Sequence, residues 1–199
     1  MVKIGFTRYL VNMNIDPSIP TSRWLSPYRG RQLLLVKTHG RNRDTIIEVI
    51  AQWIIRGSFY LIAAGEWLPE HDELRYAVFR YTLAYDRRLD HLILSRPFTC
   101  LQLLDLLIEA KQCGRPVLIM DFLHLFHDAD VDLSLRYSTL EQCCGYTRQL
   151  SLSVPVVVLV PDLNTEEYRR FFPLLASIAD EIIETSKPVD PEAVQGSLF

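Results

Sequence analysis

Apolar and polar positions along the chain follow two different periods. Short continuous apolar runs are typical of strands that are covered on both faces, and the segments between them repeat apolar residues at helical spacing. The strand-like runs are residues 33–37, 59–64, 91–95, 117–122, 154–160 and 181–185, and the helix-like segments are residues 45–56, 71–86, 98–112, 136–152 and 165–179. Because strands and helices alternate, the pattern predicts an α/β fold with a mostly parallel central sheet flanked by helices.

The alternation marks out a single domain over residues 32–186. Residues 1–31 contain Pro17, Pro20 and Pro27 among polar residues and are predicted to form an N-terminal extension. Residues 187–199 contain Pro188 and Pro191 and are expected to form a flexible C-terminal tail. The length of 199 residues is sufficient for one domain with its own apolar core.

Composition and charge exclude several classes of protein. With 49% hydrophobic and 23% charged residues the chain is not a disordered or fibrous protein, and no apolar run reaches the length of a membrane span, so we expect a cytoplasmic protein without a membrane partner. The formal net charge of -3 gives no general attraction to nucleic acid. The four cysteines show no metal-binding spacing and are expected to be reduced and mostly buried.

Basic residues do gather near the first predicted strand. A solvated face is the usual interpretation of such a cluster, and the alternative is a surface that contacts DNA or a partner, in which case DNA binding should be salt-sensitive and indifferent to sequence. The residues of this basic cluster are Arg23, Arg29, Arg31, Arg41 and Arg43.

The loop after the first strand is where an open α/β sheet binds ligands. A phosphate-binding loop has the pattern GxxxxGK[ST], in which glycines let backbone N–H groups approach the phosphates and the lysine balances their charge. Laid on that pattern, residues 38–45 keep only the final hydroxyl, Thr45, and Asp44 stands in place of the lysine. A carboxylate at ~3–4 Å from a phosphate oxygen costs several kcal/mol, so we expect no ATP or Mg²⁺ here and interpret Asp44 and Thr45 as the start of a helix.

A second feature of nucleotide sites is an apolar strand that ends in a magnesium-binding acid, and residues 117–121 have that form. The acidic residues that follow, Asp128, Asp130 and Asp132, begin like a calcium-binding loop, but Leu133 and Thr139 stand where glycine and glutamate are required. We therefore expect a solvated acidic loop. The degenerate nucleotide site predicted from these segments comprises Thr38, Gly40, Arg43, Asp44, Thr45 and Asp121.

In the order and spacing of these segments, residues 29–187 resemble the core of the RecA superfamily, which includes the recombinases and KaiC-like proteins. Leu33-Leu34-Leu35-Val36 stands where the first core strand leads into the phosphate loop, and Val117 to Asp121 matches the second nucleotide strand. The resemblance implies a RecA-like P-loop NTPase fold. Without both loop glycines and the lysine, the chain resembles a degenerate RecA-like subunit. Such subunits are found among recombinase paralogues, ImuA-type accessory factors of bacterial mutasomes and SulA-type division inhibitors.

The chain ends in Gln195-Gly196-Ser197-Leu198-Phe199, which resembles the pentapeptide that binds the bacterial sliding clamp. In such a peptide Leu198 and Phe199 would fill an apolar pocket and Gln195 would hydrogen-bond at its rim, with Ser197 at the third specified position. The alternative is a tail that folds back and packs Phe199 on its own domain.

These observations predict a non-catalytic RecA-like accessory protein in DNA repair, recombination or damage-tolerant DNA synthesis, located at the nucleoid and requiring no cofactor. The expected partners are the sliding clamp, a polymerase or recombinase subunit, further copies of the chain and DNA. One alternative is a weak ATPase that uses Asp121 and Thr45 and is completed by a partner, and another is a SulA-like inhibitor of cell division.

Overall fold

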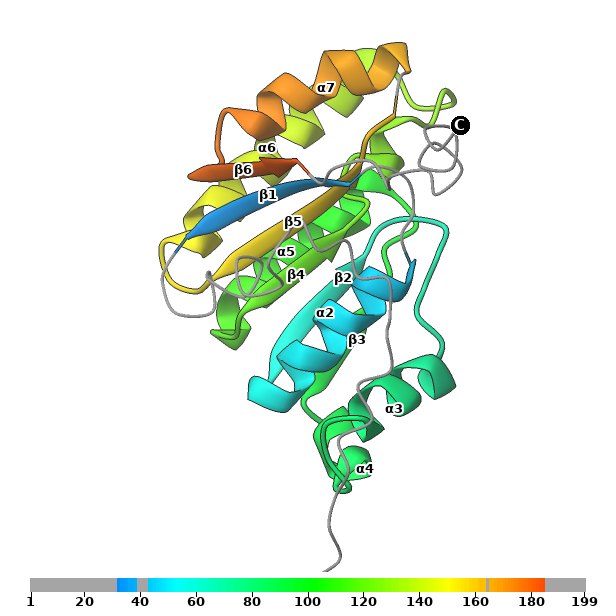
Figure 1. Cartoon of the computed structure of the whole chain (residues 1–199). Helices are drawn as coiled ribbons and strands as arrows, with labels where there is room; N and C mark the ends of the chain where they lie inside the picture. The colour runs from blue at the N-terminus through cyan, green and yellow to red at the C-terminus, as the bar shows by residue number, and fades with distance from the viewer. Residues whose placement is uncertain (1–31, 39–42, 164, 185–199) are drawn as a thin grey trace, which may run out of the picture.

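The computed structural model describes residues 32–38, 43–163 and 165–184, and these form an α/β structure around one six-stranded sheet (Figure 1). All strand pairs are parallel, which confirms the predicted α/β fold with a parallel central sheet. The spatial order is β3-β2-β4-β5-β1-β6. The strands are β1 (Leu33–Thr38), β2 (Phe59–Ala63), β3 (Leu92–Ser95), β4 (Val117–Met120), β5 (Val156–Pro161) and β6 (Glu181–Glu184).

Helices cover both faces of the sheet, as Figure 1 shows. Helices α2 (Arg43–Arg56), α3 (His71–Phe79) and α4 (Tyr85–Leu89) lie over one face, and α5 (Cys100–Cys113), α6 (Leu133–Ser151) and α7 (Glu166–Ala176) lie over the other. Successive residues of β1 point to opposite faces: Leu33 and Leu35 enter the core cluster on the α5–α7 side, and Leu34 and Val36 enter the cluster on the α2–α3 side. This burial on both faces explains the unbroken apolar runs in the sequence.

The position of β1 is the distinctive feature of the sheet. It pairs with β5 on one side and β6 on the other, so the connection from β1 through α2 to β2 passes over β5 and β4. In the two common doubly wound orders, 3-2-1-4-5-6 and 2-1-3-4-5, the first strand is instead the neighbour of the second. The sheet therefore has neither of those topologies.

The prediction of one helix over residues 71–86 is wrong, because the structure has two helices there. α3 ends at Phe79, and the chain turns before α4 begins at Tyr85. Within the turn, the backbone N–H of Ala84 donates to the Thr82 hydroxyl at 3.2 Å. A threonine side chain that bonds to nearby backbone favours a turn over a continued helix.

The predicted strand over residues 117–122 also ends earlier than expected. Asp121 has a φ of +54°, which is the left-handed region, so the strand stops at Met120 and a 3-10 turn (η2, His124–Phe126) follows. Aspartate is one of the few residues other than glycine that adopts this conformation readily. Phe122 and Phe126 are both buried and stack on each other, and Phe126 contacts Phe171 of α7.

The acidic loop after η2 serves as a helix start. Asp132 is the N-cap of α6, and its carboxylate accepts hydrogen bonds from the backbone N–H of Ser134 at 2.8 Å and of Leu135 at 3.4 Å. The Ser134 hydroxyl also donates to this carboxylate, and that bond together with the two backbone bonds lowers the pKa of Asp132. The helix consequently begins at Leu133, three residues before the predicted start.

The cysteines have the predicted state. All four are free, and Cys100, Cys143 and Cys144 are buried whereas Cys113 is exposed. Burial raises the pKa of Cys144 to about 12 and that of Cys143 still further, so neither thiol ionises near neutral pH.

A buried carboxylate joins α2 to the end of α3. The Glu48 side chain is 3% exposed and forms an ion pair with Arg80, and it also accepts a hydrogen bond from the Gln52 side chain at 2.9 Å. Such a carboxylate is costly to bury without its cation. The pair therefore fixes the position of α3 on α2.

We expect Arg80→Ala to lower the free energy of unfolding by about 2–3 kcal/mol, because it leaves the Glu48 carboxylate buried without its cation. Arg80→Lys should recover part of this loss. The measurement is urea-induced unfolding, with Arg87→Ala as the control at an exposed arginine of α4. Equal unfolding midpoints for Arg80→Ala and Arg87→Ala would contradict the assigned role of the ion pair.

Candidate functional site

The predicted nucleotide site falls at the carboxyl edge of the sheet, where β1, β5 and β4 end side by side. Asp162, just after β5, donates its backbone N–H to the Thr38 carbonyl at 2.7 Å, and the N–H of Asp121 donates to the Leu159 carbonyl at 2.9 Å. The Thr38 hydroxyl lies 3.5 Å from the Val160 carbonyl, which it faces as a donor. Because β5 lies between β1 and β4, Thr38 and Asp121 are about 10 Å apart, two strand spacings.

Lys37 is one residue before the end of β1, and its ammonium group is held between the residue that follows β5 and the last residue of β6. Nζ lies 3.1 Å from Asp162 Oδ1 and 3.7 Å from Glu184 Oε1, and 5.7 Å from the centre of the Phe172 ring on α7. Two carboxylates and an aromatic face therefore surround the charge. Lys37 stabilises the junction of β1, β5, β6 and α7.

The Asp121 carboxylate leans to the opposite side, toward the end of β2. A Cβ atom placed on Gly65 would lie 1.9 Å from Asp121 Oδ2 and 2.6 Å from its Cγ, so the carboxylate rests directly on the Gly65 backbone. Only glycine fits at position 65, because any side chain would collide with Asp121. In the sheet β2 flanks β4 on the side away from β1, so this carboxylate points away from Thr38.

The start of α2 supplies the remaining described residues of the predicted site. Asp44 is exposed in the first turn, where its charge is favourable at the helix N-terminus, as predicted. The Arg43 guanidinium lies 5.6 Å from the centre of the Trp67 ring, in the segment after β2. Thr45 belongs to the same first turn.

Several predicted site residues lie outside the described residues. They are Gly40 of the degenerate loop, Arg23, Arg29, Arg31 and Arg41 of the basic cluster, and Gln195, Ser197, Leu198 and Phe199 of the clamp-binding motif. Of the basic cluster, the structure describes Arg43 alone.

Next to this edge, His127 packs in a largely apolar setting between η2 and α7. Its ring stacks on Phe171 with centroids 6.5 Å apart, and Nε2 is buried without a hydrogen-bond partner among the described residues. Burial lowers the pKa of His127, with smaller contributions from His124 and Arg136, while Glu167 opposes the shift. Within residues 32–38, 43–163 and 165–184 no three histidines, cysteines or acids gather as metal ligands would.

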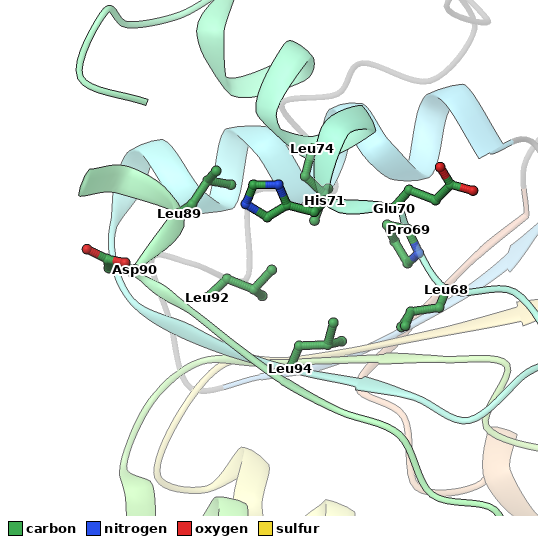
Figure 2. Close-up of a pocket in the computed structure, with 9 residues that line it drawn as sticks. All are labelled: Leu68, Pro69, Glu70, His71, Leu74, Leu89, Asp90, Leu92 and Leu94. Carbon is green, nitrogen blue, oxygen red and sulfur yellow. The ribbon is translucent and has the colours of Figure 1, made fainter. Parts of the chain in front are cut away.

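A separate apolar groove lies at the edge of the sheet that is farthest from β6, between the edge strand β3 and helices α3 and α4 (Figure 2). Its volume is about 770 Å³. It was not predicted from the sequence, because its walls come from two separate stretches, residues 68–74 and 89–94, that only the fold brings together. It is lined by Leu68, Pro69, Glu70, His71, Leu74, Leu89, Asp90, Leu92 and Leu94.

No protein-family model matches the sequence, and no curated protein matches it. Among the helices that the structure describes, none combines the length and apolar character that crossing a membrane requires. The six-stranded parallel α/β fold and the side-chain geometry at its carboxyl edge are therefore the basis for assigning a function.

The pKa of His127 leads to a prediction about acid stability. Since its folded-state pKa lies below the unfolded value of about 6.5, the unfolded chain binds a proton first as pH falls. This residue therefore destabilises the fold progressively below about pH 6.5, and has no effect well above it. We expect His127→Phe to reduce the loss of stability between pH 7.5 and 5.5, measured by urea unfolding. The exposed control His71→Gln should leave that loss unchanged, and an unchanged loss in His127→Phe would contradict the prediction.

Proposed function

We propose that this chain is a RecA-like accessory protein that acts in DNA repair, recombination or damage-tolerant DNA synthesis by binding other proteins and does not turn over ATP. The absence of ATP turnover is proposed because the Lys37 ammonium group and the Asp121 carboxylate are held apart at the carboxyl edge. Lys37 of β1 is held by Asp162, just after β5, and by Glu184 of β6, and the Asp121 carboxylate, just after β4, rests on Gly65 near the end of β2.

The sheet supports the RecA-like half of the proposal. A RecA-like core needs the strand before the phosphate loop and the strand with the magnesium acid to end at one edge, and β1 and β4 do so with β5 between them. The strand order also differs from the common dinucleotide-binding order. Both points agree with the sequence resemblance over residues 29–187.

A phosphate site needs a cation and donors that converge on the anion. Coulomb attraction falls with distance, and a lysine already paired with two carboxylates adds little net positive charge for a phosphate. Asp44, exposed at the start of α2, adds a further negative charge on this edge. The electrostatics of the described part of the edge thus oppose a triphosphate.

We expect the purified full chain to show no saturable ATP binding up to about 1 mM, a concentration at which binding free energy is only about 4 kcal/mol. Equilibrium dialysis with Mg²⁺–ATP measures this directly. Saturable binding that Asp121→Ala abolishes, with Asp105→Ala as an exposed control on α5, would contradict the proposal and favour an ATPase completed by a partner.

The partner that we propose first is a bacterial sliding clamp, bound through residues 195–199. The motif places an adjacent Leu198-Phe199 pair after Gln195, which suits an apolar pocket with a polar rim. Body and tail would then have separate roles, the tail binding the clamp and the RecA-like domain binding a polymerase or recombinase subunit.

We expect the full chain to bind a purified clamp with a Kd of about 1–10 µM, as short linear motifs do, and Leu198→Ala/Phe199→Ala to weaken binding at least about 10-fold. Val194→Ala, immediately before the motif, is the matched control and should bind as the unaltered chain does. Surface plasmon resonance gives both affinities. Absence of binding by the unaltered chain, or equal binding by the double variant, would overturn this partner.

A further inference from the structure

The groove beside β3 has the form of a binding site for an extended chain. Figure 2 shows Leu92 and Leu94 on its floor, with Leu74 and His71 of α3 above and Leu89 of α4 at one end. Most of its lining side chains are apolar, and Leu94 remains 38% exposed. Its volume of about 770 Å³ lies in the range of sites that enclose a ligand of several side chains.

The backbone of β3 is open along the same groove. Among the described residues β3 pairs with β2 alone, and the register sets Leu92 opposite Phe59, whose N–H donates to the His91 carbonyl at 3.0 Å. In a parallel ladder His91 and Ile93 therefore direct their backbone groups to β2. The N–H and C=O groups of Leu92 and Leu94 face the open edge.

The two edge strands of the sheet differ in how they are protected. β6 has the sequence Glu-Ile-Ile-Glu, and charged side chains of this kind discourage pairing with another strand. β3 has the sequence Leu-Ile-Leu-Ser and contains no charge. An uncharged open edge beside an apolar groove requires a cover.

Charges at the groove define what that cover should be. The Glu70 and Asp90 carboxylates stand at opposite ends in Figure 2, and none of the described residues that line the groove is a lysine or arginine. A complementary segment is extended, apolar at every second position and basic. Residues 2–8, Val-Lys-Ile-Gly-Phe-Thr-Arg, have that pattern: Val2, Ile4 and Phe6 alternate, with Lys3 and Arg8 and no acid.

We propose that residues 2–6 of this chain dock intramolecularly on the β3 edge as an added strand, with Val2, Ile4 and Phe6 in the groove. Their extended length of about 13–16 Å matches the four residues of β3. Arg8, on the same face of the alternation as Val2, Ile4 and Phe6, supplies positive charge toward the carboxylate at one end of the groove. Docking buries the apolar side chains of the groove and pairs the outward backbone groups of Leu92 and Leu94.

The chain is long enough for this contact within one molecule. β3 lies four strand spacings from β1, which is about 19 Å. Residues 7–31 lie between the docking segment and the first described residue, and a chain of that length can span up to about 80 Å. A tether of this kind gives an effective concentration near the millimolar range, which favours docking in the same molecule over docking between molecules.

The test is amide hydrogen exchange of the full chain, read at Leu92 and Leu94 by NMR. If residues 2–6 add a strand, these amides should exchange about 10-fold or more faster in Ile4→Asp/Phe6→Asp than in the unaltered chain. The matched control is Thr7→Asp/Tyr9→Asp, which adds the same charge on the other face of the alternation and should keep the protection. The amide of Ile119 in the central strand β4 should be unchanged in both.

A second variant tests the groove from its own side. Leu94→Asp places a charge on the groove floor and should speed exchange of the Leu92 amide as much as Ile4→Asp/Phe6→Asp does. Leu83→Asp, at an exposed position outside the groove, should leave that exchange rate unchanged. Equal exchange rates of the Leu92 amide in the unaltered chain and in all of these variants would overturn the proposal. So would protection that rises with protein concentration, because a second copy would then supply the strand.

Discussion

The structure depends on how β1 is held between β5 and β6. At its start, the Leu33 N–H donates to Asp180 Oδ2 at 2.8 Å, and the Asp180 N–H donates back to the Leu33 carbonyl at 2.9 Å. Arg148 of α6 binds the same carboxylate at 2.7 Å, and these bonds lower the pKa of Asp180. At the other end the Asp162 N–H binds the Thr38 carbonyl. β1 is thus fixed at both ends by segments more than 120 positions away.

This placement of β1 decides the chemistry at the carboxyl edge. Because β5 and β6 flank β1, Asp162 after β5 and Glu184 of β6 are brought within 4 Å of Lys37. On the far side of β5, the left-handed turn at Asp121 sets its carboxylate on Gly65. Both charged groups are therefore held by their neighbours, on opposite sides of β5.

Much of this fold was predictable from the sequence because β4 and β5 are buried on both faces and read as unbroken apolar runs. The break between α3 and α4 was missed, since Thr82 and its neighbours do not disrupt the apolar spacing on which the prediction relied. The ion pairs of Lys37 could not be foreseen, because Asp162 and Glu184 are distant in sequence and meet it only through the strand order. The requirement for glycine at position 65 likewise follows from the conformation of Asp121.

The groove beside β3 depends on the same long-range packing. Its upper wall is α3, which the Glu48–Arg80 ion pair and the 3.3 Å contact between Gln52 and Tyr81 attach to α2. Its floor is β3, which is positioned by β2. The position of α3 over the groove therefore depends on a buried carboxylate of α2 as well as on the packing of its lining residues. Weakening that ion pair should loosen α3 and the docking of residues 2–6 together, which couples the stability of this face of the domain to its occupancy.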